Sequence, residues 1–223
     1  MIRFLRSLPF ALEFAVVMSL SLGVFVFNSV WDVFHSGLHQ HLSAARLTGL
    51  VFYELGVIAV LFPLLHLRGW TFAKIGLRAT LRDTGIGVAL AAASYSAWAG
   101  IWFMTVMLSP STAMHMLSTP VMTERVPLAI AVAVSLVNPL FEEIWVSGYL
   151  MTALRRDHDS WFAINVSVAV RLVYHLYQGT QAVLSITPIG LIFGIWYART
   201  GRLWPLVVAH ALMDLFALVA IGR

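Results

Sequence analysis

The chain has 223 residues, of which 60% are hydrophobic and only 11% charged, and its formal net charge is +4 at pH 7. A mean hydropathy of +0.87 lies outside the range of ordinary soluble domains and predicts a membrane protein. The absence of cysteine excludes disulfides and thiolate chemistry, and because the modest positive charge is spread over loops we expect no nucleic-acid partner.

Seven apolar segments follow one another along the chain. They cover residues 9–30, 47–65, 85–108, 127–154, 161–177, 182–197 and 204–221. The first follows Arg3 and Arg6 as a signal peptide would, but it is longer than an h-region of about 7–15 residues, so we expect it to be retained. The sequence therefore predicts an all-α polytopic membrane bundle of about seven transmembrane segments, with residues 1–223 as one integral membrane domain.

Basic residues are distributed unevenly between the connections. One side carries ten, Arg3, Arg6, Arg68, Lys74, Arg78, Arg82, Arg155, Arg156, Arg199 and Arg202, and the other carries three, Arg46, Arg125 and Arg223. The positive-inside rule then predicts that the N-terminus and the even-numbered loops are cytoplasmic, in a plasma or inner cell membrane whose lipid is a partner. Residues 68–83 mix basic and apolar side chains at near-helical spacing, so we expect an amphipathic stretch along the cytoplasmic interface.

Ionisable side chains interrupt three of the later segments. In chain order they are Glu142, Glu143, Arg171, His175, His210 and Asp214. An ionisable group at the centre of a bilayer costs about 2.5–3.5 kcal/mol, so such residues are rare unless they have a function or a partner. Because they lie on separate apolar segments, we expect them to close into one buried polar site within residues 127–218. The uncharged connection 178–181 is expected to be a short buried turn beside that site.

These residue types suit the hydrolysis of a peptide bond. That reaction needs an activated water, a donor to the developing oxyanion and a proton for the leaving amine. Glu142 and Glu143 would repel each other if both were ionised, so one should be protonated or paired with Arg171. Neighbouring residues of a helix diverge by about 100°, so only one of the two can face the water. His210 and Asp214 are one turn apart and can line the same cavity.

The order of these motifs resembles that of the CPBP family (CAAX proteases and bacteriocin-processing enzymes, also called the Abi family). Its members carry EExxxR, FxxxH and HxxxN motifs on consecutive membrane helices, matched here by residues 142–147, 171–175 and 210–214. The run at 196–201 also looks like the family's stretch before its last motif, and the resemblance covers residues 127–218.

The resemblance implies a glutamic intramembrane endopeptidase that needs no cofactor. It implies that Glu142 is the base, that Glu143 has a supporting role paired with an arginine, and that His175 and His210 are catalytic. The implied substrate is a protein or peptide with a membrane-associated segment. Prenylated CAAX tails are one substrate class of the family.

Three positions depart from the family's motifs. Ser147 stands in place of Arg, Arg171 in place of Phe, and Asp214 in place of Asn. Since one basic residue is lost and another gained, we expect Arg171 to reach the carboxylates that an Arg at position 147 would neutralise. An ionised Asp214 cannot donate a hydrogen bond, so it should either be neutral or orient His210.

Two alternatives stay open. Glu142, His175 and His210 could be the ligands of a zinc-dependent membrane protease, although the sequence has no HExxH motif. The departures from the motifs also suit a catalytically silent membrane protein of the same fold, such as an immunity protein or one that binds a peptide or protein partner.

Overall fold

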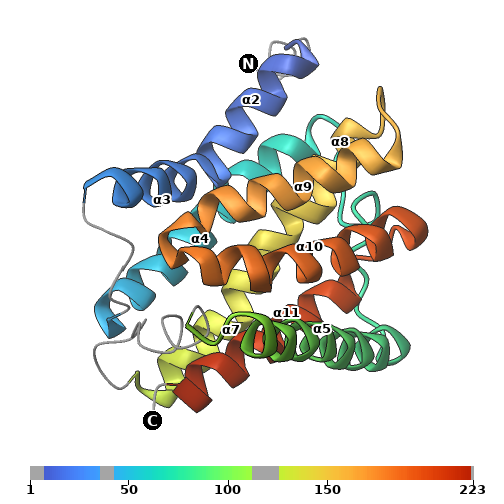
Figure 1. The fold of residues 1–223 in the computed structure, drawn as a ribbon. Coiled ribbons are helices and arrows are strands. Elements are labelled where there is room, and N and C mark those ends of the chain that lie inside the picture. Colours follow the sequence, from blue (N-terminus) through green and yellow to red (C-terminus); the bar gives the residue numbers. More distant parts are fainter. Residues whose placement is uncertain (1–7, 36–42, 112–125, 222–223) are drawn as a thin grey trace.

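The computed structural model describes residues 8–35, 43–111 and 126–221, and every element in these ranges is helical (Figure 1). The elements are α2 (Phe10–Ser21), α3 (Gly23–His35), α4 (Ala44–His66), α5 (Leu81–Leu108), α7 (Leu128–Glu142), the π-helix η1 (Glu143–Met151), α8 (Thr152–Leu154), α9 (Ser160–Tyr174), the 3₁₀ turn η2 (Leu176–Gln178), α10 (Thr180–Thr200) and α11 (Trp204–Ile221). Each predicted apolar segment coincides with one or more of these helices over most of its length, and the predicted all-α membrane bundle is confirmed.

Three helical runs of the described chain are long and apolar enough to cross a membrane. They are α4, α5 and the continuous run Leu128–Leu154 through α7, η1 and α8. The bent pair α2 and α3 can count as a fourth span, and α9 and α11 are shorter apolar helices. In the most apolar part of Leu128–Leu154, 56% of the residues are buried, against 17% in α4 and in α5. This run therefore lies inside the bundle, and α4 and α5 present apolar side chains to lipid.

The first predicted segment is not one continuous helix. α2 ends at Ser21, and α3 leaves it at an angle of 57° and continues to His35. The hydroxyl of Ser21 donates to the carbonyl of Val17 at 2.7 Å, a contact that bends helices, and Gly23 follows directly. The predicted apolar segment over 9–30 is therefore a bent pair of helices that can count as one broken span.

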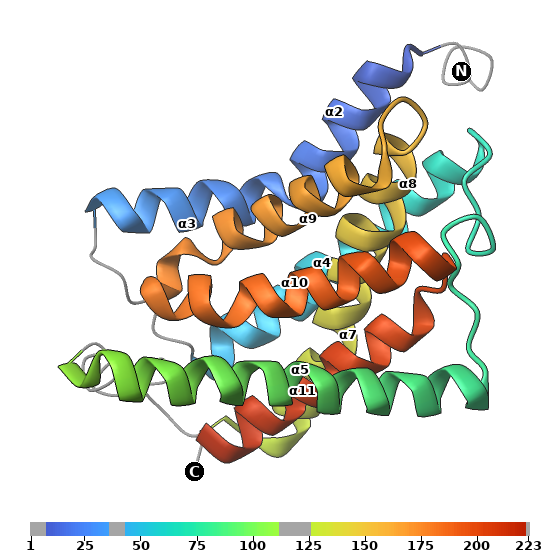
Figure 2. The same cartoon turned by 45° about the vertical axis from the view of Figure 1, so that its right-hand side comes forward.

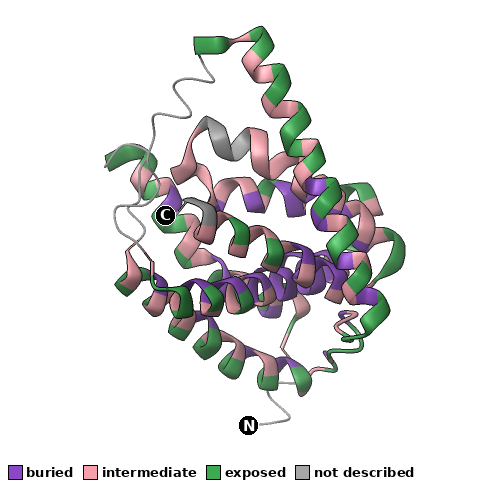
Figure 3. Ribbon diagram, turned by 90° about the horizontal axis from the view of Figure 1, so that it is seen from below, coloured by how far each residue is buried: buried purple, intermediate pink, exposed green. Residues whose placement is uncertain are grey.

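The π-helix η1 is the centre of the core, and all nine of its residues are buried. Buried residues concentrate on the inner helices, whereas the outward faces are exposed (Figure 3). A Cβ atom on Gly148 would lie 3.2 Å from side-chain atoms of both Ile75 and Leu203, so a glycine lets η1 approach these two segments closely. π-helical turns are rare and occur frequently at functional sites.

Helix α10 packs on α9 through two glycines one turn apart. A Cβ atom on Gly190 would lie 3.2 Å from Val168, and one on Gly194 would lie 3.1 Å from Ile164. Small residues at this spacing allow two membrane helices to approach closely. The two helices run side by side in both ribbon views (Figures 1 and 2). This packing fixes the position of α9, which carries Arg171 and leads into His175.

Two connections bear on the predictions. Residues 68–80 form turns rather than a helix, because Gly69 and Gly76 have φ angles of 84° and 73°. The segment is nevertheless amphipathic, with Trp70 and Ile75 buried and Phe72 exposed. A turn is present within 178–181: Gly179 has a φ angle of 66° and lets the chain reverse from η2 into α10, although Gln178 and Gly179 are only partly buried, rather than buried as predicted.

Candidate active site

A cavity of about 510 Å³ lies between α5, α7, α9, α10 and α11. It is lined by Tyr95, Trp98, Ala99, Glu142, Arg171, His175, Gln178, Ser185, Ile186, Ile189, His210, Met213, Asp214, Phe216 and Ala217. Five of the six ionisable residues singled out in the sequence therefore face one space. The sixth, Glu143, is fully buried beside it.

Glu142 is the last residue of α7 and places its carboxylate on the cavity wall. The hydroxyl of Tyr174 donates to its Oε2 atom at 2.5 Å, and the amide of Asn138 donates to Oε1 at 3.3 Å. The guanidinium of Arg171 lies 3.7 Å from Oε2. One carboxylate oxygen is thus held firmly, whereas the other has only a long hydrogen bond and remains available to a molecule in the cavity.

Glu143, the first residue of η1, has no exposed surface but three donors. Its Oε2 atom accepts hydrogen bonds from Arg171 at 2.7 Å and from the Ser147 hydroxyl at 2.6 Å. Its Oε1 atom lies 3.0 Å from Nδ1 of His210. A buried carboxylate is tolerated when its charge is matched and its oxygens are hydrogen-bonded. The two neighbouring glutamates thus have different environments, as the divergence of adjacent helical residues predicts.

Arg171 and Ser147, two of the three departures from the family's motifs, lie in contact with each other. The Nη2 atom of Arg171 donates to Glu143 and also to the hydroxyl of Ser147, at 3.0 Å. The guanidinium therefore lies next to the position where the EExxxR motif has its arginine. The predicted contact between Arg171 and the carboxylate pair is present, and α9 rather than η1 supplies the positive charge.

The two histidines are each oriented through Nδ1. In His175 this atom lies 2.8 Å from the carbonyl oxygen of Arg171, and since a carbonyl only accepts, Nδ1 carries the proton. The Nε2 atom of His175 is then a lone-pair acceptor. In His210, Nδ1 is held by Glu143, and Nε2 lies 3.6 Å from Asp214. Both imidazoles are at the cavity wall.

Two polar residues that contact Glu142 were not among the predicted site residues, although their positions in the sequence suggest a role. Tyr174 directly precedes His175, and Asn138 lies four residues before Glu142 in an apolar run. Asn138 also donates to the buried Glu54 of α4 at 2.7 Å, which makes Glu54 a helix–helix hydrogen-bonding residue. A polar residue one turn from an intramembrane carboxylate is a searchable pattern, although its partner is not predictable from spacing alone.

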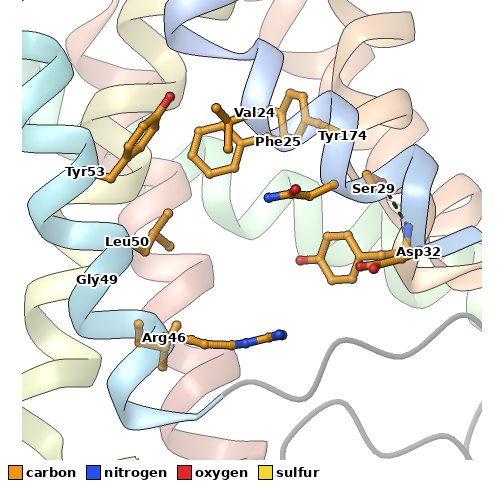
Figure 4. A pocket seen from close by; sticks show the side chains of 12 residues that line it. Val24, Phe25, Ser29, Asp32, Arg46, Gly49, Leu50, Tyr53 and Tyr174 are labelled. Carbon is orange, nitrogen blue, oxygen red and sulfur yellow. Dashed lines mark hydrogen bonds between the residues drawn. The ribbon is translucent and has the colours of Figure 1, made fainter. Parts of the chain in front are cut away.

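Tyr174 also borders a second cavity, of about 470 Å³, between α3 and α4. Figure 4 shows Tyr174 at one end of this space, with Asp32 and Arg46 on the two helices farther away. Tyr174 thus lines the second cavity while its hydroxyl donates to Glu142, which lines the first.

The described residues contain no group of three or more His, Cys, Asp or Glu side chains arranged to hold a metal ion. The imidazoles nevertheless have Nδ1 partners, an arrangement that is also typical of metal-binding histidines. The zinc alternative is therefore left to experiment.

Comparisons with known proteins point to the same part of the chain. Residues 124–216 match a family model described as type II CAAX prenyl endopeptidase Rce1-like. Over 96 residues the chain is 32% identical to a Bacillus subtilis (strain 168) protein named "Putative membrane peptidase YdiL". The matched stretch covers 43% of this chain and 38% of that relative. No solved structure gives a significant match. The matched region contains every Glu, Asp, Arg and His residue that lines the cavity.

Proposed function

Because the motif-bearing region of this integral membrane protein belongs to the CPBP (CAAX protease) family, we propose that the chain is an intramembrane endopeptidase whose nucleophile is a glutamate-activated water. The observation that carries the proposal is the position of Glu142. Its carboxylate faces the cavity with one oxygen held by Tyr174, while Glu143 is neutralised behind it.

The proposed reaction begins with a water between Glu142 and the substrate carbonyl. Glu142 removes a proton from this water, the oxygen adds to the carbonyl carbon, and a tetrahedral oxyanion forms. His210 acts in its doubly protonated form: its Nδ1–H is held by Glu143, and its Nε2–H, on the side that faces Asp214, donates to the oxyanion. The carbon–nitrogen bond then breaks, and the proton held by Glu142 passes to the leaving amine, giving one acid and one amine product.

Three neighbouring side chains support this step. His175 has a lone pair at Nε2 and shares or relays the proton of the water. Arg171 lies near both carboxylates and keeps Glu143 ionised, so that Glu143 can hold His210. Asp214 assists by orienting the imidazole of His210. No metal or cofactor is part of this proposal.

The substrate is proposed to be a protein or peptide with a membrane-associated segment. The cavity lies inside an apolar bundle, and much of its wall is apolar, including Trp98, Ile186 and Phe216. An extended peptide near a lipid-anchored terminus could reach such a site from the membrane or from the cytoplasm. A prenylated CAAX tail is one candidate, in keeping with the family description.

The test compares purified wild type with Glu142→Gln. The probes are a farnesylated fluorescent peptide that ends in a CAAX tail and a panel of membrane-anchored peptides, with cleavage followed by mass spectrometry. We expect the wild type to cleave at least one probe, and Glu142→Gln to lose at least about 10²-fold in rate, because the base is removed. Glu54→Gln is the matched control: Glu54 is also buried and hydrogen-bonded to Asn138, but it does not line the cavity.

Unchanged turnover in Glu142→Gln would exclude the glutamate mechanism. A wild type that cleaves no probe but binds one of them tightly would favour the silent binding protein instead. Elution as a single species in size-exclusion chromatography shows for each variant that loss of activity is not loss of folding.

A further inference from the structure

A third cavity, of about 500 Å³, lies away from the proposed active site. It is formed where the start of α2, the loop after α4 and the turn after α8 meet, and it is lined by Leu8, Phe10, Glu13, Arg68, Trp70, Lys74, Thr152 and Arg156. Figure 2 shows α2 and α8 close together at the same end of the bundle. None of the residues proposed for hydrolysis contributes to it.

The one carboxylate among the residues that line this cavity, that of Glu13, already has partners within the protein. Glu13 is ion-paired with Arg68 and accepts further hydrogen bonds from the indole of Trp70 at 2.9 Å and the hydroxyl of Tyr149 at 3.0 Å. Arg68 is held in place on its other side by the carbonyl of Leu8, at 2.8 Å. These contacts neutralise Glu13 and make it part of a rigid wall rather than a repulsive charge facing the cavity.

Two further cations project from opposite segments of the wall. Lys74 lies 4.3 Å from the ring centre of Trp70, and Arg156 lies 4.2 Å from that of Phe10. Neither has a carboxylate within ion-pair distance in the described part of the chain. The aromatic rings orient the two side chains, and with Arg68 they leave an excess of two positive charges over Glu13.

We propose that this cavity binds the phosphate group of an anionic phospholipid. Basic pockets between membrane helices bind anionic headgroups, and Arg and Lys are the usual ligands of phosphate. A lipid is favoured over a soluble phosphate because Leu12, Val16 and Leu20 form an exposed apolar stripe along α2, leading away from the cavity. An acyl chain can lie on this stripe while the headgroup occupies the cavity.

The test measures lipid selectivity of the purified full-length chain in a neutral detergent by native mass spectrometry. The probes are phosphatidylglycerol and phosphatidylcholine with identical acyl chains, and inorganic phosphate as competitor. We expect the wild type to prefer phosphatidylglycerol, and this preference to fall roughly fivefold for each basic side chain removed in Lys74→Gln with Arg156→Gln.

The matched control is Arg78→Gln with Arg155→Gln, which removes the same charge from exposed neighbours that do not line the cavity. Its selectivity should stay at the wild-type value. If both double variants lost the preference for phosphatidylglycerol equally, diffuse surface charge would explain it and the cavity would not. If the wild type had no preference for phosphatidylglycerol, the site would be excluded. Complete displacement of phosphatidylglycerol by inorganic phosphate would overturn the assignment to lipid. These readouts do not depend on hydrolysis, so they are separate from the test of the proposed function.

Discussion

Arg171 is the residue on which the polar centre of the bundle depends. It is buried, contacts Glu143 and Ser147 directly, and lies near Glu142. Taking one partner from a buried ion pair leaves the other charge without compensation, which typically costs about 3–5 kcal/mol. The exchange of an arginine at position 147 for one at position 171 thus keeps a cation beside the same carboxylate.

We therefore predict that Arg171→Ala is strongly destabilising and impairs activity. Ser147→Arg alone should also destabilise, because its side chain has no exposed surface and would enter a space that Arg171 fills. The double variant should be more stable than either single one, since the new guanidinium can occupy the vacated space beside Glu143. Unfolding in SDS from mild detergent micelles gives the free energies for a double-mutant cycle.

Additive effects in this cycle would mean that positions 147 and 171 do not share one charge site. If Arg171→Ala changed neither stability nor hydrolysis, Arg171 would not be the partner of the carboxylates. That result would favour a catalytically silent protein of the same fold.

At the scale of elements, the contact between α9 and α10 positions the residues of α9. Gly190 and Gly194 allow α10 to approach Val168 and Ile164, and Arg171 Cδ lies 3.5 Å from where a Cβ atom on Gly190 would be. A Cβ atom at either glycine would already require atoms of α9 to move slightly, and a large side chain would separate the helices. The ion pair between Arg171 and Glu143, which joins α9 to η1, would be stretched by the same movement.

We predict that Gly190→Leu or Gly194→Leu lowers the free energy of unfolding by about 1–3 kcal/mol through overpacking. Gly56→Leu in α4 is the control, because the glycine is exposed and a Cβ atom there meets nothing within 4 Å. The same SDS unfolding assay compares the three. Equal stability of all three variants would show that the close approach of α9 and α10 contributes nothing.

At the scale of the whole molecule, the cavity gathers side chains from five helices inside an apolar bundle. We propose that peptide hydrolysis in this cavity needs only these side chains and a water. We predict that exhaustive chelation followed by gel filtration leaves hydrolysis unchanged, and that elemental analysis finds less than stoichiometric zinc. Loss of activity on chelation and its return with added zinc would instead make Glu142, His175 and His210 metal ligands.

The sequence by itself determined the class of the protein and the identity of its polar residues. In a bilayer the backbone must satisfy its own hydrogen bonds, and apolar segments of roughly 20 residues do so as helices. An ionisable residue in such a helix must have a partner or a function, which made Glu142, Glu143, Arg171, His175 and His210 recognisable without coordinates. Their assigned roles, and the orientation of the chain in the membrane, stay predictions.

Only the tertiary structure decided which of these residues face the cavity and which partners they have. Tyr174 and Glu142 are 32 positions apart, and His210 and Glu143 are 67 apart, so their contacts depend on how the helices pack. Segments that are apolar on nearly every side do not reveal which face is buried, so their periodicity could not predict that packing. The bend after Ser21 escaped prediction for a different reason: it arises from a local hydrogen bond and a glycine within a run whose hydropathy does not change.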